Sequence, residues 1–242
     1  MIKLNKSVFF ETELCKNYFF AELYPIRNKN GGIKMLNTRG VGKSHGNVRK
    51  MVVTAMLSGI CLFLGLTGLG FVPLPLFKLT ILHLPVIIGA IVEGPIVGAS
   101  IGFIFGLFSI YQNITAPTPM SPFFYNPLVS ILPRVLIGVI AYYIYKLIKS
   151  KIKNAKVSII IAALCGSLVN TIGVLGTIYL VYFKDYATIL MDKGTIANNS
   201  LSAVTTALLT VIGTNGIAEA ILSAVIVTPI VIAIFKMQKK RI

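Results

Sequence analysis

Acidic side chains are scarce in this chain, which holds 7 Asp and Glu residues against 23 Lys and Arg residues. Between residues 51 and 236 the acidic residues are Glu93, Asp185, Asp192 and Glu219. No two of them have the spacing of a catalytic carboxylate pair, and no phosphate-binding loop of the form GxxxxGK-Ser/Thr occurs. The sequence therefore excludes a nucleotide-hydrolysing site, and any energy input must come from a partner protein.

Histidine and cysteine are also rare. The two histidines, His45 and His83, belong to no HExxH arrangement. The three cysteines, Cys15, Cys61 and Cys165, are scattered, which supports neither a disulfide framework nor a metal site. Two of the cysteines lie in apolar segments and are expected to be small packing residues. We therefore expect no catalytic residue, no metal, no cofactor and no enzyme activity.

Charged residues make up 12% of the chain, whereas soluble domains average about 25%. Hydrophobic residues make up 55%, and the mean hydropathy is +0.83. This composition predicts an integral membrane protein and excludes a soluble enzyme. A net charge of +16 would indicate nucleic-acid binding in a soluble protein. Here the basic residues flank apolar segments, so we predict contact with the lipid bilayer and not with nucleic acid.

The apolar segments predict an all-α protein with six transmembrane helices. We place these helices at residues 51–69, 80–93, 96–113, 128–147, 157–183 and 217–236. The second has 14 residues and reaches about 21 Å, short of a roughly 30 Å hydrocarbon core. Gly98, Gly102 and Gly106 share one face of the third helix, so this face should pack tightly against another helix. A polar loop is expected at 184–200 and a helix break at 213–216.

The distribution of basic residues predicts the orientation in the membrane. Residues 1–50, 146–156 and 236–241 hold 19 of the 23 Lys and Arg residues. Placing these segments inside puts both the N-terminus and the C-terminus in the cytoplasm of a plasma-membrane protein. Irregular segments then gather on the outer side, where we place a substrate pocket under outer loops. These segments are 70–79, 114–127, 184–200 and 213–216.

The predicted organisation is a basic N-terminal segment (1–49), a six-helix membrane domain (50–236) and a basic cytoplasmic tail (237–242). Two interpretations of residues 1–34 remain open. They form a disordered cytoplasmic tail, or translation starts at Met35, because codons for Asn30-Gly31-Gly32 can resemble a ribosome-binding sequence at a suitable distance.

The most apolar part of the chain, residues 80–140, contains few polar residues: His83, Glu93, Gln112, Asn113, Asn126 and Arg134. A charge in this setting needs a partner or a cavity. Arg134 is therefore a candidate clamp for a carboxylate or phosphate, and the alternative is an internal ion pair with Glu219.

Uncharged polar residues supply further candidates. Asn126, Asn170 and Asn215 offer two-sided amide hydrogen bonding to a ligand, or they join helices to one another. His83 is either a ligand contact or a satisfied structural histidine. Residues 114–127 hold four prolines and three aromatic residues, with Phe124 and Tyr125 among them. We interpret this segment as a lid over the site, and an interfacial aromatic belt is the alternative.

Four segments carry a resemblance to a known family: TILHLPVIIGAIVEGPIVGASIGFIFGLFS, APTP, ILPRVLIGV and GTNGIAEAI. Over residues 50–236 the chain resembles the substrate-binding S component of energy-coupling factor (ECF) transporters, and most of all its pantothenate-type members. The resemblance implies a six-helix fold that captures a vitamin outside the cell. It also implies a membrane coupling subunit and two cytoplasmic ATPases as partners.

The resemblance further implies that a small-residue motif on the first helix contacts the coupling subunit. This motif falls on Ala55 and Gly59, where Gly replaces the family's second Ala; packing inside the bundle is the alternative. Pantothenate would place its carboxylate on Arg134 and its hydroxyl and amide groups on the asparagines and His83. The alternative hypotheses for the function are an S component for another vitamin or small solute, or an ion-coupled secondary transporter. A membrane enzyme or receptor is disfavoured, because no catalytic cluster occurs.

Overall fold

A computed structural model describes residues 25–27, 33–35, 41–73, 78–118, 120–152, 154–192 and 201–240. The chain divides into two units, Met1–Lys50 and Met51–Ile242, which we describe separately. In the first unit β1 (Pro25–Arg27) pairs antiparallel with β2 (Ile33–Met35). Strand β1 and the first two residues of β2 lie within residues 1–34, for which a disordered tail was one of the two interpretations. Cys15 and Asn30-Gly31-Gly32 lie outside the described residues.

Helix α2 (Val41–Leu66) covers most of the first predicted span, residues 51–69. It begins ten residues before that span and ends three residues before the span's predicted end. The chain then turns at Gly68, whose positive φ of 74° suits glycine because it has no Cβ. Strands β3 (Phe71–Pro73) and β4 (Lys78–Thr80) follow as an antiparallel pair in which Phe71 faces Thr80. Prolines exclude a helix here, as predicted, but the sequence analysis missed the strands.

Helix α3 (Leu84–Glu93) is short, and its residues from Leu84 to Ile91 are all buried. It joins α4 (Pro95–Thr115) through Gly94, which has a φ of 107°. A proline in the first turn of each helix fits, since that turn needs no intrahelical N–H donor. Helix α3 thus belongs to the core of the membrane unit.

Glycines bring α4 against α7 (Leu132–Lys151) at backbone distance, as predicted. A Cβ on Gly98 would lie 3.0 Å from the Cα of Gly138 on α7, and a Cβ on Gly106 would lie 2.8 Å from the Cα of Ile131. A Cβ on Gly102 would overlap the backbone carbonyl of Arg134. This close packing of small residues fixes the position of the helix that carries Arg134.

Two predicted loops contain helices instead. The segment 114–127 includes α5 (Ser121–Phe124), and α6 (Pro127–Ser130) begins at its end. Helix α8 (Ala155–Val181) is followed by α9 (Phe183–Asp192), where a polar loop was expected. The prediction failed because the polar residues of this segment occupy one face of a helix. Tyr186 and Leu190 on its other face are buried.

The last hydrophobic stretch is continuous, and the helix break predicted at 213–216 is wrong. Helix α10 (Leu201–Val211) passes into a π-helical turn, η1 (Ile212–Gly216), and then into α11 (Ile217–Lys240). A π-turn adds a residue to the helix without interrupting it, which glycine and asparagine tolerate. The polar residues therefore mark a widened turn.

Five segments of the described chain are long and apolar enough to cross a membrane: Asn47–Leu66, Pro95–Thr115, Pro127–Lys151, Ala155–Val181 and Ser202–Gln238. Helix α3 is apolar but has 10 residues, fewer than the roughly 20 that a span needs. The chain is thus a helical integral membrane protein, with two short strand pairs among its described residues, and the count of six spans stays a prediction.

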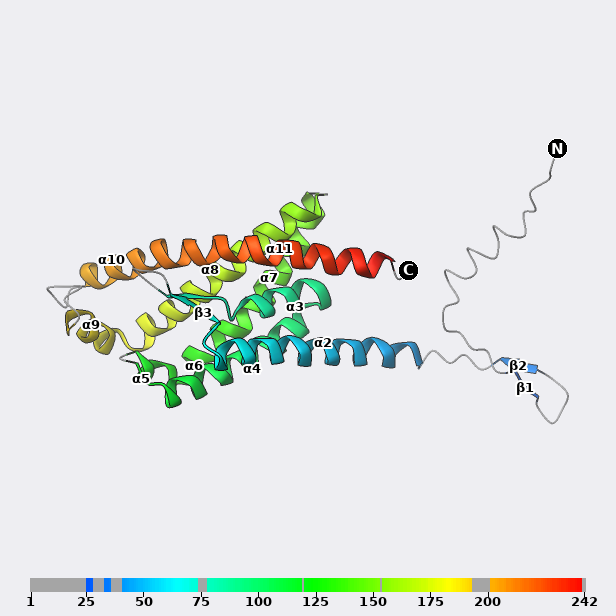
Figure 1. Ribbon diagram of the computed structural model, residues 1–242, viewed down its shortest axis with the longest axis horizontal. Helices are drawn as coiled ribbons and strands as arrows, with labels where there is room; N and C mark the ends of the chain where they lie inside the picture. Colours follow the sequence, from blue (N-terminus) through cyan, green and yellow to red (C-terminus); the bar gives the residue numbers. More distant parts are fainter. Residues whose placement is uncertain are drawn as a thin grey trace. The chain divides into compact units, whose positions relative to one another are not determined.

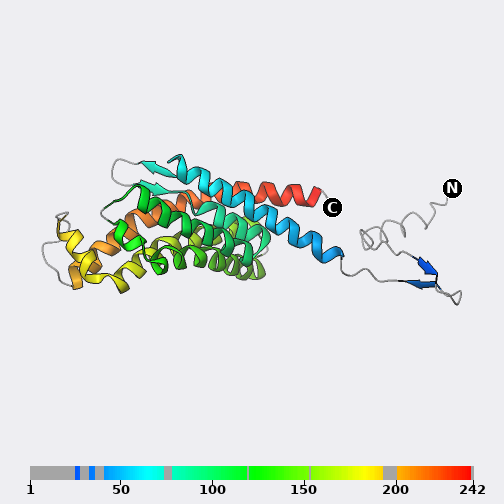
Figure 2. The same ribbon diagram turned by 90° about the horizontal axis from the view of Figure 1, so that it is seen from below.

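Within the membrane unit, α4 packs on α7, α7 on α8, and α8 on α11. Figures 1 and 2 show α5 and α9 at one end of this bundle, away from the C-terminal end of α11. The main apolar core includes α3, Ile101, Ile137 and Ala163. A second apolar cluster joins α5, α8 and α9 through Phe123, Ile178 and Tyr186.

Candidate functional site

A cavity of about 840 Å³ opens within the membrane unit between β3–β4, α4, α5, α7, α8, η1 and α11. Four of the residues predicted to bind substrate line it together: Phe124, Arg134, Asn170 and Asn215. A cavity of this size is within the range that small-molecule ligands occupy. The fold therefore gathers residues that lie more than 90 positions apart in the sequence.

Arg134 lies in the first turn of α7 and is 7% exposed. Its Nη1 donates a hydrogen bond to the carbonyl oxygen of Val129 at 2.8 Å, and its Nε has no hydrogen-bond partner. The guanidinium carbon lies 5.6 Å from the ring centroid of Phe105 and 5.4 Å from that of Phe124. The guanidinium has five N–H donors, and aromatic rings attract a cation only modestly without accepting these hydrogen bonds in full. The guanidinium of Arg134 therefore keeps donors that a ligand can use.

Glu219, also 7% exposed, lines the same cavity. Its Oε1 accepts a hydrogen bond from the backbone N–H of Thr80 at 2.8 Å, and its Oε2 accepts one from the hydroxyl of Thr171 at 3.3 Å. Among the described residues, no carboxylate lies within ion-pairing distance of Arg134. The alternative of an internal Arg134–Glu219 ion pair is therefore wrong.

The two other predicted asparagines in the cavity come from α8 and η1. Asn170 is 8% exposed, and its Oδ1 has no hydrogen-bond partner in the described structure. Asn215 lies in the π-helical turn, with Val211 before it and Glu219 after it, and all three line the cavity. The widened turn keeps these residues on one face of a continuous helix, so η1 sets which side chains reach the site.

Three predicted site residues are not among those that line the cavity. Nε2 of His83 lies 2.8 Å from the hydroxyl of Ser223, and the ring is buried. Asn126 caps α6, since its Oδ1 accepts the N–H of Leu128 at 3.0 Å and its Nδ2 donates to the hydroxyl of Tyr182 at 3.2 Å. These hydrogen bonds favour the structural interpretation of both residues, although Nδ1 of His83 has no partner in the described structure.

The third, Tyr125, is 46% exposed, and its hydroxyl donates to the carbonyl of Asn113 at 3.4 Å. Its exposure fits an interfacial aromatic residue. The same segment also covers the cavity, which Ala116, Thr118, Met120 and Phe124 line. The lid interpretation and the aromatic-belt interpretation of this segment both stay predictions.

The sequence analysis assigned no role to several polar residues of the cavity. Ser109, Gln112 and Asn113 project from one face of α4, where spacings of three and four residues could have revealed them. Asn113 is held in place: its Nδ2 donates to the carbonyl of Ser109 at 2.8 Å, and its Oδ1 accepts the hydroxyl of Ser121 at 2.8 Å. No sequence pattern singles out Thr171, next to Asn170, as a site residue.

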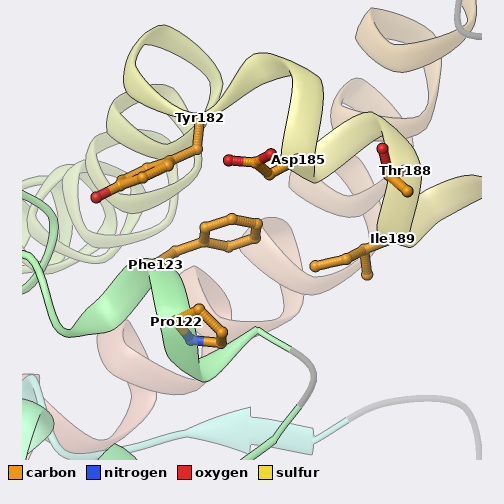
Figure 3. A pocket seen from close by; sticks show the side chains of 6 residues that line it. All are labelled: Pro122, Phe123, Tyr182, Asp185, Thr188 and Ile189. Atoms are coloured by element: carbon orange, nitrogen blue, oxygen red, sulfur yellow. The ribbon is translucent and has the colours of Figure 1, made fainter.

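A smaller hollow of about 280 Å³ lies between α5 and α9. Figure 3 shows Pro122 and Phe123 on one side of this hollow and Tyr182, Asp185, Thr188 and Ile189 on the other. The ring centroids of Phe123 and Tyr186 are 6.4 Å apart, so aromatic packing joins α5 and α9, and Tyr182, just before α9, lies 5.2 Å from Phe123. Its lining includes no predicted site residue, and we place the candidate site in the larger cavity.

Comparison with known proteins identifies the class of protein. Residues 49–231 match the family described as "ECF transporter, substrate-specific component". The chain belongs to this family, and is thus a multi-pass membrane protein that serves transport and is not an enzyme. It is also similar to the pantothenic acid transporter PanT of Lactococcus lactis subsp. cremoris (strain MG1363). The two are 32% identical over 179 residues, which cover 68% of this chain and 81% of the relative.

Proposed function

We propose that this protein is the high-affinity substrate-capture subunit of an ATP-driven vitamin importer, and that its solute is pantothenate. In this proposal six helices cross the membrane, both termini are cytoplasmic and the cavity opens to the outside. The observation that carries the proposal is Arg134, a buried cation that lines a cavity and has no anionic partner among the described residues. An intramembrane charge in a cavity marks a ligand site.

The chemistry of the cavity supports a small organic acid. The guanidinium of Arg134 can bind a carboxylate with two parallel hydrogen bonds. Asn170 and Asn215 can pair with amide and hydroxyl groups, and Phe124 and Met120 provide apolar contact. Pantothenate has these groups: a carboxylate, an amide, two hydroxyls and a gem-dimethyl centre. The similarity to a pantothenic acid transporter favours it over other vitamins.

The charges of α7 support the proposed orientation. Arg134 and the cavity lie at the beginning of this helix, whereas Lys146, Lys149 and Lys151 lie at its end. Basic residues collect on the cytoplasmic side of membrane proteins. The cavity would then face outward, as capture of an external vitamin requires.

The surface of α2 supports a membrane partner. Ala55 and Gly59 are exposed, and a Cβ on Gly59 would meet no atom within 4 Å. Packing inside the bundle therefore does not explain these small residues in the described structure. We propose that they contact a membrane coupling subunit, which two cytoplasmic ATPases serve, because small residues allow close approach of another helix.

Ligand binding to the purified protein tests the proposed function. Native mass spectrometry should detect co-purified pantothenate, and calorimetry should show tight binding. Arg134→Ala should weaken binding by about 3–5 kcal/mol, roughly two to four orders of magnitude, because it leaves the ligand's carboxylate unpaired. Lys184→Ala, which removes an exposed cation on α9, is the matched control and should bind normally. Unchanged affinity in Arg134→Ala would remove Arg134 from the site.

A further inference from the structure

The cavity has a second charged group that the proposed function does not use. Glu219 is as buried as Arg134 and lines the same cavity, yet the two side chains form no ion pair. Burying a carboxylate is costly unless hydrogen bonds stabilise it. A buried acid beside an unpaired buried base would be expected to form a salt bridge if the cavity had no other use for the two charges.

The hydrogen bonds of Glu219 leave part of its carboxylate free. Its two oxygens offer about four acceptor positions. The N–H of Thr80 at the end of β4 fills one of them, the hydroxyl of Thr171 on α8 fills another, and the side chain of Thr80 also contacts the carboxylate. Both donors belong to fixed elements, so they hold the carboxylate in one orientation. Glu219 lines the cavity, so the remaining acceptor positions of its carboxylate can accept hydrogen bonds from a ligand there.

We propose that Glu219 determines specificity by accepting hydrogen bonds from hydroxyl groups of the substrate. This inference rests on the proposed function and deepens it. Arg134 binds the carboxylate of the ligand, and Glu219 binds the hydroxylated end. The substrate class is then a small monoanionic hydroxy acid, and an acid of the same shape without hydroxyls is rejected because Glu219 would be left with unmade hydrogen bonds.

Two other possible roles of Glu219 lead to different expected ligand preferences. As a strut, it would only attach the β3–β4 hairpin to α11 through Thr80. As a counter-ion, it would bind an ammonium group, and the cavity would then prefer a zwitterion to a hydroxy acid. Each role assigns a different ligand preference to the same carboxylate, so ligand pairs can separate them.

The experiment measures binding of two ligands to the purified protein and to Glu219→Gln. The ligands are pantothenate and N-(3,3-dimethylbutanoyl)-β-alanine, which keeps the carboxylate, the amide and the branched carbon but lacks both hydroxyls. We expect Glu219→Gln to weaken pantothenate binding about ten-fold or more, the usual effect of losing a hydrogen bond to a charged group. Binding of the analogue should change less than about three-fold. Asp185→Asn, an exposed acid outside the cavity, is the matched control and should change neither.

The outcomes are distinct. Equal weakening for both ligands would show that Glu219 is only a strut and would overturn the inference. Tighter binding of β-alanine than of pantothenate by the unaltered protein would overturn it in favour of an ammonium site. If Glu219→Gln does not fold, the unaltered protein decides: a clear preference for pantothenate over the analogue supports the inference, and equal affinity overturns it. Failure of the unaltered protein to bind either ligand would refute the proposed function, and the inference with it.

Discussion

Two residues of the cavity wall carry buried polar atoms without a hydrogen-bond partner in the described structure: Nε of Arg134 and Oδ1 of Asn170. His83 also has an unpartnered ring nitrogen, Nδ1, but its Nε2 lies 2.8 Å from the hydroxyl of Ser223 and the residue does not line the cavity. A buried polar atom without a partner costs about 1–3 kcal/mol. Such atoms in a cavity wall are therefore best explained by a ligand that completes their hydrogen bonds.

Asn170 and Asn113 offer a direct comparison, because both line the cavity but only Asn113 has both ends of its amide bonded within the protein. We expect Asn170→Leu to leave the melting temperature of the ligand-free protein unchanged or higher, and to weaken pantothenate binding by about 1 kcal/mol or more. Asn113→Leu should lower the melting temperature, since it leaves the hydroxyl of Ser121 with one partner fewer. Thermal unfolding and calorimetry on both variants check this. A lower melting temperature for Asn170→Leu alone would contradict the assignment.

Helix packing decides where Arg134 lies. The glycine face of α4 meets α6 and α7 at backbone distance, and Gly102 touches the carbonyl of Arg134 itself. A side chain at this contact would push α7 away and carry the guanidinium with it. The position of the Arg134 guanidinium in the candidate site thus depends on Gly102, a residue without a side chain.

Gly102→Ala tests this dependence against Gly176→Ala, the same substitution at a glycine of α8 where a Cβ meets no atom within 4 Å. Overpacking at Gly102 should destabilise the protein by about 1–3 kcal/mol and weaken ligand binding. At Gly176 the substitution should be neutral or stabilise by up to about 1 kcal/mol, because alanine favours the helix. Unfolding and binding measurements on both variants check the expectation. Similar stability of the two variants would show that α7 moves aside without cost.

For the molecule as a whole, the proposed function assigns substrate capture and partner docking to different surfaces. The cavity lies between β3–β4 and the helices α4, α5, α7, α8, η1 and α11, whereas the exposed small residues belong to α2. The sequence has few acidic residues and no GxxxxGK-Ser/Thr loop, and the proposed function takes its energy from a partner protein. Binding should therefore survive changes that abolish uptake.

Gly59→Leu should retain pantothenate affinity and lose uptake, because a bulky side chain prevents close approach of the coupling subunit. Gly176→Leu, at another glycine with open space around it, is the control and should retain both. Uptake by proteoliposomes with and without the ATP-driven coupling module, together with binding to the isolated variants, provides the measurement. Transport by the unaltered protein without the module would favour an ion-coupled secondary transporter instead.

Sequence patterns predicted much of this protein correctly. Low charge and long apolar runs predicted a helical membrane protein, and the glycine spacing of α4 predicted its close packing. The sequence analysis also singled out Arg134, Asn170, Asn215 and Phe124, which line one cavity. The sequence missed the β3–β4 pair and α9 because three-residue strands and a half-polar helix carry weak periodic signals.

The sequence by itself determined that this protein lies in a lipid bilayer, since water cannot accommodate such a composition. It also determined that the charge of Arg134, in an apolar segment, needs a partner or a cavity. Only the tertiary structure shows that Arg134 lines a cavity and forms no ion pair with Glu219. Whether Arg134 pairs with Glu219 depends on how α7 and α11 are placed by contacts between distant segments, which no local pattern encodes. Those contacts hold Glu219 to Thr80 and Thr171 and leave Arg134 at a cavity with no anionic partner among the described residues.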